Sequence, residues 1–319
     1  MKKIIRRIIA AVLALLMMLA AAGCSEKSSG DPLLDAGKNA AKYLYKLYEM
    51  EYGSEWLAAS LGGYELGVSS SWREKYAKAV EETAAECGGV FNANKYTEQS
   101  SCIIGLTAAG YDASDFCGYD LTAPLGDYDT VLLQGLSGAA WALIALDCGN
   151  YDMPQSPDAE VQATREMYVD YILSRKLSDG GFAFSGEYAD TDMTAMVLMA
   201  LAPYSERADV AEAIDGGVEC LMKLQNDDGG FSSCGTANAE SCAQVIVALT
   251  RLGIKSDDER FVKNGTTVLD KLLTYQKKDG SFMHTDGGDS DAMSTEQALT
   301  AIVSCLRQNS GNPDIYTMK

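Results

Sequence analysis

Acidic residues gather in three glycine-containing loops of the sequence, where their side chains could act as acids, bases or ion ligands. The loops span residues 178–192, 226–240 and 279–291 and contain no lysine or arginine. Their acids are Asp179, Glu187, Asp190, Asp192, Asp227, Asp228, Glu240, Asp279, Asp286, Asp289 and Asp291. Each nearby carboxylate repels a diphosphate by about 1 kcal/mol even in water. We expect a surface that binds a neutral or cationic group, or a bridging Ca²⁺ ion; the alternative is a set of solvated turn acids.

Two short motifs at the ends of these loops carry donor types that suit proton transfer or ligand binding. Asp190 and Asp192 stand two residues apart, so a dry, coupled pair could work as a Brønsted acid. The alternative is that both only stabilise a helix N-terminus. Glu240 and Cys242 have the same spacing and offer a carboxylate and a thiol. The candidate catalytic residues are thus Asp190 and Asp192, and the candidate ligand-binding residues are Asp179, Asp228, Glu240, Cys242, Asp279 and Asp291.

The loops recur because the chain repeats one unit. Its Asp-Gly steps begin at Asp179, Asp228 and Asp279, which are 49 and 51 residues apart, a period that accommodates two helices and their turns. Apolar residues recur at helical spacing before and after each loop. We expect the glycines to stop the first helix, and Asn238, Thr191 and Ser290 or Ser294 to cap the second. Each unit is therefore predicted to be a helical hairpin.

The first half of the chain follows the same pattern less regularly. Ser156-Pro157 is expected to open the outer helix of the Asp179 unit, and no segment alternates in the way a sheet requires. Residues 31–308 are expected to form one domain of twelve helices, or six hairpins, in an open solenoid or a closed ring. Residues 309–319 would be a C-terminal tail. Helices are expected near 33–50, 55–61, 72–87, 97–109, 127–134 and 137–148.

The N-terminus has the pattern of an export signal. Four basic residues precede a 15-residue apolar run, Ile8 to Ala22, which is shorter than the roughly 20 residues of a membrane-spanning helix. The following Leu19–Cys24 stretch resembles a bacterial lipobox. We expect cleavage after residue 23, a lipid on Cys24, a tether over 24–30, and attachment to the lipid bilayer outside the cytoplasmic membrane. The alternative is an ordinary signal peptide with an unrelated cysteine.

The charge balance argues against nucleic-acid binding. Without residues 1–23 the chain has 22 Lys and Arg against 45 Asp and Glu, a balance of −23. Such a surface repels phosphate backbones and anionic headgroups. Eight cysteines remain after Cys24, and Cys220, Cys242 and Cys305 fall on apolar helix faces, where buried thiols are favoured over disulfides.

The Gln-x-x-x-Gly-x-Phe spacing of Gln225 to Phe231 and of Gln276 to Phe282 resembles the QW-type repeat of squalene cyclases and protein prenyltransferase β subunits. The resemblance covers residues 165–308, although Lys176 replaces the glutamine in one copy and phenylalanine replaces the usual tryptophan. It implies an all-α fold, an α/α toroid of six hairpins.

The functional motifs of these families are incomplete here. Protein prenyltransferases hold zinc with an Asp-x-Cys pair and a histidine one repeat later; Glu240 and Cys242 match the pair, but Ser294 stands at the histidine position and His284 lies too early. Zinc is therefore not expected. Squalene-hopene-type cyclases protonate their substrate with an Asp-x-Asp-Asp motif. In this chain Asp190 and Asp192 match its first two acids, and Met193 stands in place of the last one. Cobalamin carriers resemble the chain in general character but add a β domain for which no room is left.

Two function classes follow from the resemblance and its gaps. The favoured class is a non-catalytic cell-surface lipoprotein that uses the toroid as a scaffold for an unknown small-molecule or protein ligand. The alternative is a terpenoid-cyclase-like enzyme that acts on an isoprenoid or other apolar substrate, with Asp192 as acid and Asp190 as its partner. The acidic loops would exclude isoprenoid diphosphates in either case.

Overall fold

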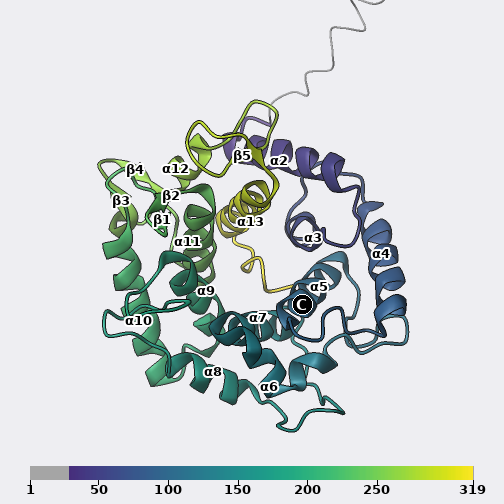
Figure 1. Cartoon of the computed structure of the whole chain (residues 1–319). Coiled ribbons are helices and arrows are strands. Elements are labelled where there is room, and N and C mark those ends of the chain that lie inside the picture. The colour runs from purple at the N-terminus through teal and green to yellow at the C-terminus, as the bar shows by residue number, and fades with distance from the viewer. Residues whose placement is uncertain (1–28, 319) are drawn as a thin grey trace, which may run out of the picture.

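The computed structural model describes residues 29–318, in which twelve α-helices form an outer and an inner ring (Figure 1). Each inner helix packs against two inner neighbours, and the last one packs back on the first hairpin, so the ring is closed. This confirms the predicted α/α toroid; Cys24 and the signal peptide lie outside the described residues. The outer helices are α2 (Pro32–Tyr48), α4 (Trp72–Cys87), α6 (Tyr128–Val131), α8 (Arg165–Leu173), α10 (Ala208–Leu224) and α12 (Val268–Thr274). The inner helices are α3 (Glu55–Gly63), α5 (Tyr96–Ala109), α7 (Gly135–Cys148), α9 (Thr191–Leu201), α11 (Ala239–Arg251) and α13 (Ala292–Asn309).

Short elements connect the helices. Residues 29–318 contain no extended sheet, but they contain three two-stranded antiparallel ladders that we did not predict, because two residues are too few to show alternation. The ladders are β1 (Ser232–Ser233) with β2 (Thr236–Ala237), β3 (Val262–Lys263) with β4 (Thr266–Thr267), and β5 (Phe282–Met283) with β6 (Ser290–Asp291). The 3₁₀ helices are η1 (Ala123–Gly126), η2 (Leu132–Gln134), η3 (Ala202–Tyr204) and η4 (Glu259–Phe261).

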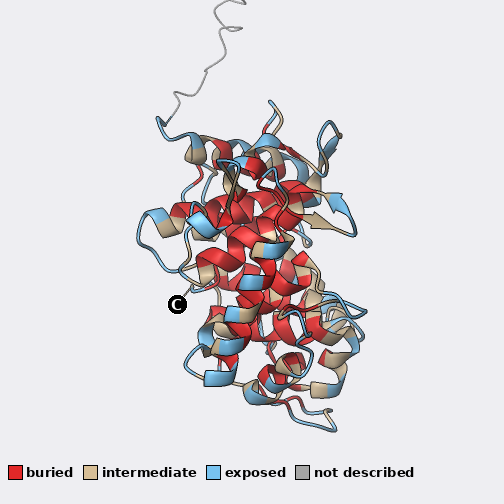
Figure 2. Ribbon diagram, turned by 90° about the vertical axis from the view of Figure 1, so that its left-hand side faces the viewer, coloured by how far each residue is buried: buried red, intermediate tan, exposed pale blue. Residues whose placement is uncertain are grey.

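The core lies between the two rings of helices (Figure 2). Inner helices are apolar around most of their circumference, and in α7 the consecutive residues 142–146 are all fully buried. The stretch Tyr128–Cys148 is long and apolar enough to cross a membrane, but 61% of its most apolar 18-residue window is buried inside the protein. Its composition is explained by its place in the wall of the ring.

The repeated glycines mediate contact between hairpins, and our expectation that they stop the helices is wrong. Helix α10 ends at Leu224, because Gln225 already has an extended backbone, and Gly229 follows in the left-handed region at φ +86°. A Cβ atom on Gly229 would lie 2.8 Å from the Thr266 carbonyl oxygen in the next hairpin. Only glycine allows both this conformation and this approach. The equivalent glycines are Gly180, which faces Gly216, and Gly280, which faces Asn39.

The motif glutamines join each loop to the hairpin that follows it. The Gln225 side-chain amide donates to the Gly229 carbonyl at 2.9 Å and to the Phe261 carbonyl at 2.8 Å. Gln276 does the same for the last and first hairpins, donating to the carbonyls of Gly280 and Ala36. In the copy without glutamine, Lys176 instead forms a 2.9 Å ion pair with Glu212 of α10.

Two of the three predicted caps in the repeat units need correction, whereas the helices expected near 33, 55, 72 and 97 begin within one residue of these positions. Asn238 is the cap of α11, as expected, and accepts from Ser241 N at 2.8 Å. The cap of α9 is Asp190 and not Thr191, and the cap of α13 is Asp291 and not a serine, because aspartate at these positions already reaches the third backbone N–H.

The outer helix of the Asp179 unit starts later than predicted. Helix α8 begins at Arg165 with Thr164 as its cap. Ser156-Pro157 lies in a turn, where Ser156 N donates to the Gln162 side chain at 3.0 Å. The Ser-Pro pair therefore belongs to the connection between hairpins.

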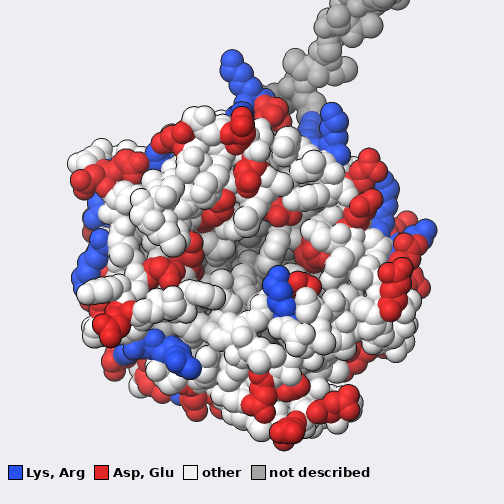
Figure 3. Space-filling model, viewed as in Figure 1, with Lys and Arg blue, Asp and Glu red and all other residues white. Residues whose placement is uncertain are grey.

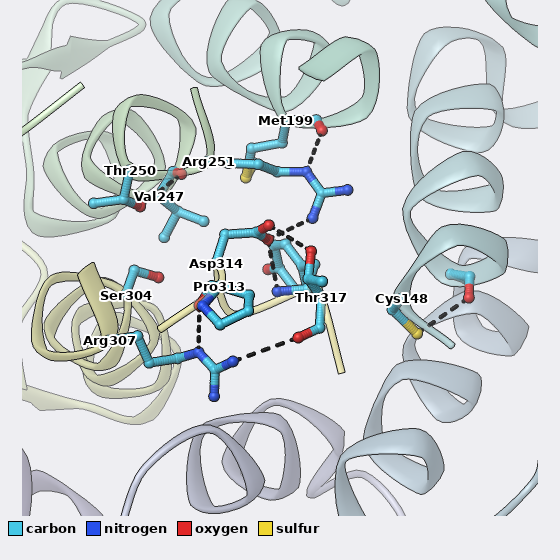
Figure 4. Close-up of polar contacts among 12 residues, drawn as sticks. Cys148, Met199, Val247, Thr250, Arg251, Ser304, Arg307, Pro313, Asp314 and Thr317 are labelled. Atoms are coloured by element: carbon cyan, nitrogen blue, oxygen red, sulfur yellow. Dashed lines mark hydrogen bonds and ion pairs between the residues drawn. The ribbon is translucent and has the colours of Figure 1, made fainter. Parts of the chain in front are cut away.

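The C-terminal residues fold into one end of the ring (Figures 1 and 4). Ile315 and Tyr316 are buried, and Met318 N donates to the Cys148 carbonyl at the end of α7. Arg251 forms a 2.7 Å ion pair with Asp314. In the side view the C-terminus lies away from the β-strands, so the tail closes the end opposite the acidic loops (Figure 2).

Candidate functional site: the central pocket of the ring

The centre of the ring holds a pocket of about 370 Å³. Five inner helices and the C-terminal tail contribute to it. The face of the ring that carries the three acidic loops, here called the rim, is hollowed at this position (Figure 3). A concave site with mostly apolar walls and a few polar groups is the usual form of a small-molecule site. The lining residues are Trp56, Trp141, Met196, Ala243, Gln244, Val247, Met293, Glu296, Gln297, Thr300 and Tyr316.

Three aromatic side chains form a continuous wall of the pocket. The rings of Trp56 and Trp141 lie 4.9 Å apart between centroids with a tilt of 54°. The Tyr316 ring meets Trp141 edge-on at 6.2 Å. These residues come from α3, α7 and the tail, so the wall exists only when the ring and the tail are both in place.

Glu296 is the only lining residue with an ionisable carboxyl group. Its side chain is 8% exposed, and its Oε1 atom has no hydrogen-bond partner in the described structure. Burial raises the pKa of Glu296 to about 7; the nearby charges of Glu55 and Asp291 add to this, and a hydrogen bond with Tyr48 opposes it. The carboxyl group is thus partly protonated at neutral pH.

The predicted catalytic pair does not line this pocket, although the charge of Asp190 contributes to the raised pKa of Asp192. Asp190 is occupied by capping, with Oδ1 accepting from Met193 N at 2.7 Å and Oδ2 accepting from Phe184 N at 3.0 Å. Asp192 is partly buried, which raises its pKa against the opposing effect of Ser241 and Ser233. Its Oδ1 atom is buried without a partner. Asp192 lies one turn toward the rim from Met196, outside the pocket lining.

The predicted ligand-binding acids of the loops mainly hold their own loops in shape. Asp179 accepts from the backbone N–H groups of Gly181 and Ala189, and Asp279 accepts from Ser281. Asp228 is paired with a base: Lys271 of α12 reaches both Asp228 and Asp286 at 3.0 Å.

The acidic rim therefore includes a neighbouring cation. The loops themselves contain no lysine or arginine, but Lys271 reaches them from the adjacent helix, which corrects the expectation of a rim without a paired base. Figure 3 shows acidic side chains around the central hollow, together with a basic side chain at its edge.

Glu240 and Cys242, which we considered as zinc ligands, point to different environments. Glu240 accepts from Ser294 Oγ at 2.6 Å and lies 2.9 Å from His284 Nδ1. Cys242 is fully buried, and burial raises the pKa of its thiol to about 12. Asp291 accepts from Ser294 N as the cap of α13. Residues 29–318 contain no group of three His, Cys, Asp or Glu side chains placed to hold a metal ion. The expectation of no zinc and the hypothesis of Ca²⁺ stay predictions.

A repeat-based signal for the pocket was available in the sequence. Met196, Gln244 and Gln297 all lie six residues after the cap of their inner helix, and all three line the pocket. Aligning the repeats on their caps would have identified this inward-facing position. Glu296 and Ala243 likewise both lie five residues after their caps and line the pocket, whereas the two tryptophans and Tyr316 carry no comparable repeat signal.

The sequence matches the family described as the prenyltransferase alpha-alpha toroid domain over residues 126–237 and 209–312. These segments cover more than half of the chain, so the protein belongs to this family. Drimenyl diphosphate synthase from Streptomyces showdoensis is 29% identical over 162 residues, which are 50% of this chain and 30% of that protein. The chain thus spans less than a third of this curated relative.

Solved structures with the same fold have different activities. A type II terpene cyclase from Scytonema superposes with a TM-score of 0.60 at 13% identity and covers 86% of this chain and 99% of its own. An unsaturated glucuronyl hydrolase from Bacillus sp. GL1 gives a TM-score of 0.58 at 12% identity, covering 89% of this chain and 97% of its own. At these identities the similarity establishes the fold, and function has to be argued from the site.

Proposed function

We propose that the protein is a membrane-anchored lipoprotein of the extracytoplasmic face whose toroid binds a small, largely apolar ligand in the central pocket without converting it. The observation that carries this proposal is the composition of the pocket, an aromatic and aliphatic enclosure in which two glutamines, a threonine and a single carboxyl group supply the polar side chains. Such a lining favours binding through burial of apolar surface.

The absence of catalysis is inferred from Asp190 and Asp192. A strong carboxylic acid catalyst needs a dry, coupled partner. Both oxygens of Asp190 accept backbone hydrogen bonds, from Met193 N in the first turn of α9 and from Phe184 N in the loop, so its side chain is committed to holding this helix start.

A terpenoid-cyclase-like enzyme is the second candidate. The buried, unpartnered Oδ1 atom of Asp192 and its raised pKa favour it, because these are properties of a proton donor. The similarity to a drimenyl diphosphate synthase also favours the enzyme candidate. In this case the substrate would be a neutral apolar molecule, since the rim repels diphosphates.

Titration with geraniol and with geranyl diphosphate tests the proposed function. We expect geraniol to change the tryptophan fluorescence and to be recovered unchanged, and geranyl diphosphate to bind at least tenfold more weakly, which corresponds to about 1.4 kcal/mol. Val247→Trp fills the pocket and should abolish geraniol binding, whereas Val161→Trp, at an exposed site, should not. A cyclised product that disappears in Asp192→Asn would establish the enzyme instead.

The membrane anchor gives a separate prediction. Mass spectrometry of the mature protein should find a diacylglyceryl group on Cys24 as the first residue, since small residues lead to this cysteine after a short apolar run. Cys24→Ser should shift the protein from the membrane fraction to the soluble fraction or leave the precursor uncleaved. A mature protein that begins at another residue would contradict the lipobox assignment.

A further inference from the structure

We propose that the central pocket takes a ligand carrying a methylated ammonium group, held by the rings of Trp56, Trp141 and Tyr316 and by the carboxylate of Glu296. This inference rests on the proposed role of the pocket as a ligand site and specifies the ligand's chemical class. Four features support it: the buried carboxyl group, the aromatic wall, the scarcity of other acceptors and the charge of the rim.

The carboxyl group of Glu296 lacks a compensating charge. It is more than nine-tenths buried, it borders the pocket, and its Oε1 atom has no partner among residues 29–318. A buried carboxylate is costly unless it is paired. None of the other lining residues is Lys, Arg or His, so the protein itself supplies no cation from the pocket wall. A cationic ligand would provide the missing partner.

The aromatic wall suits the same charge. A cation within about 6 Å of an aromatic ring is attracted by its electron-rich face, and the effect grows when water is excluded. Trp56, Trp141 and Tyr316 place three such rings on one pocket. The Arg251 guanidinium already lies 5.5 Å from the Tyr316 ring, on the tail side.

The shortage of acceptors favours a methylated ammonium over a primary one. A primary ammonium group carries three N–H donors that need acceptors. The Gln297 side-chain oxygen already accepts from Gln244 Nε2 at 3.0 Å, and the Thr300 oxygen lies 3.3 Å from the Ser60 hydroxyl, so Glu296 and the Gln244 side-chain oxygen are the main acceptors left on the pocket wall. A methylated ammonium has few or no donors to satisfy, and its methyl groups would contact Met196, Met293 and Val247.

The remaining charged groups around Glu296 are acidic. Glu55 of α3 and Asp291 at the start of α13 face it, and Tyr48 of α2 is a neutral hydrogen-bond partner. The α11 residues on the pocket are the uncharged Ala243, Gln244 and Val247. The acids of the rim extend this negative potential to the mouth of the pocket (Figure 3), where it raises the local concentration of cations.

Calorimetric titration with choline and with its uncharged isostere 3,3-dimethyl-1-butanol tests the inference. We expect choline to bind at least tenfold more tightly than the isostere. Glu296→Gln should remove this preference, while the affinity for the isostere changes less than twofold. Glu259→Gln, an exposed acid away from the pocket, serves as the matched control and should bind choline like the unchanged protein.

The pH dependence provides a second readout. With a pKa of about 7, Glu296 is about nine-tenths ionised at pH 8 and one-tenth ionised at pH 6. Choline affinity should therefore fall about tenfold when the pH is lowered from 8 to 6. Choline binding at pH 6 should release a proton, visible as a dependence on buffer ionisation enthalpy. The isostere should show neither effect.

Each outcome separates the inference from the proposed function. Equal binding of choline and isostere, or an unchanged preference in a folded Glu296→Gln variant, would overturn the cation proposal and leave an apolar pocket. Absence of choline binding in the unchanged protein would also overturn it. The geraniol titration then decides independently whether the pocket binds ligands at all.

Discussion

Replacement of Gly280 with alanine is expected to lower the free energy of unfolding by about 3 kcal/mol. Gly280 has φ +94°, where a side chain costs about 1–2 kcal/mol. A Cβ atom would also overlap the Asn39 carbonyl oxygen, so the backbone of the first hairpin would have to move. The melting temperature should fall by about 5 °C, as measured by circular dichroism.

Gly287→Ala is the matched control for this prediction. Gly287 has φ +76° in the same loop, but no atom lies within 4 Å of the position of its Cβ. The free energy of unfolding of this variant should fall by only about 1 kcal/mol, the conformational cost of a side chain at this backbone angle. If both alanine variants lose the same stability, the close approach between the first and last hairpins has no energetic role.

Replacement of Arg251 with methionine is expected to cost about 3 to 5 kcal/mol and to release the tail. The Arg251 side chain is 2% exposed, donates to the Met199 carbonyl at 2.6 Å and pairs with Asp314 at 2.7 Å (Figure 4). Removal of one member of a buried pair leaves an uncompensated charge. Urea unfolding measures the loss, and limited proteolysis should cut the variant first after residue 310. Loss of Tyr316 from the pocket wall should also weaken geraniol binding.

Arg260→Met is the corresponding exposed-pair control. Arg260 lies 2.8 Å from Asp258, but its side chain is 44% exposed, and such pairs contribute about 0–1 kcal/mol. A second test is Arg251→Met combined with Asp314→Asn, which should recover part of the stability because no unpaired charge remains. A loss in Arg251→Met no larger than in Arg260→Met would show that the tail is held by its apolar residues alone.

The fold could be predicted because its signals are local and repeated. The Asp-Gly steps at Asp179, Asp228 and Asp279 set the period, and the glutamines of the motif identify the toroid family. The errors arose where two residues could serve the same local role. Asp190 and Thr191 are both competent caps, and the structure uses the aspartate.

The pocket could not be predicted in the same way, because it depends on the closure of the ring. Trp56 and Trp141 lie in hairpins far apart in sequence, and Tyr316 lies in a tail to which we assigned no function. Glu296 resembles an ordinary surface acid of a helix until α2 and α3 cover it. The loop acids were predicted as ligand-binding residues because their charge can be read from the sequence. The direction in which a side chain points cannot be read in this way.

The closed ring also determines when the chain can finish folding. Ser60 meets Thr300, and Gln276 meets Ala36, in each case across 240 residues of sequence. Contacts of such long range slow folding, because loop closure has to be achieved before they form. An open solenoid can add hairpins one by one, but this ring has to wait for α13, which follows all the other described helices in the chain. A nascent chain would therefore not close its ring until α13 has been synthesised, and an unclosed chain is compatible with N-terminus-first transport across a membrane.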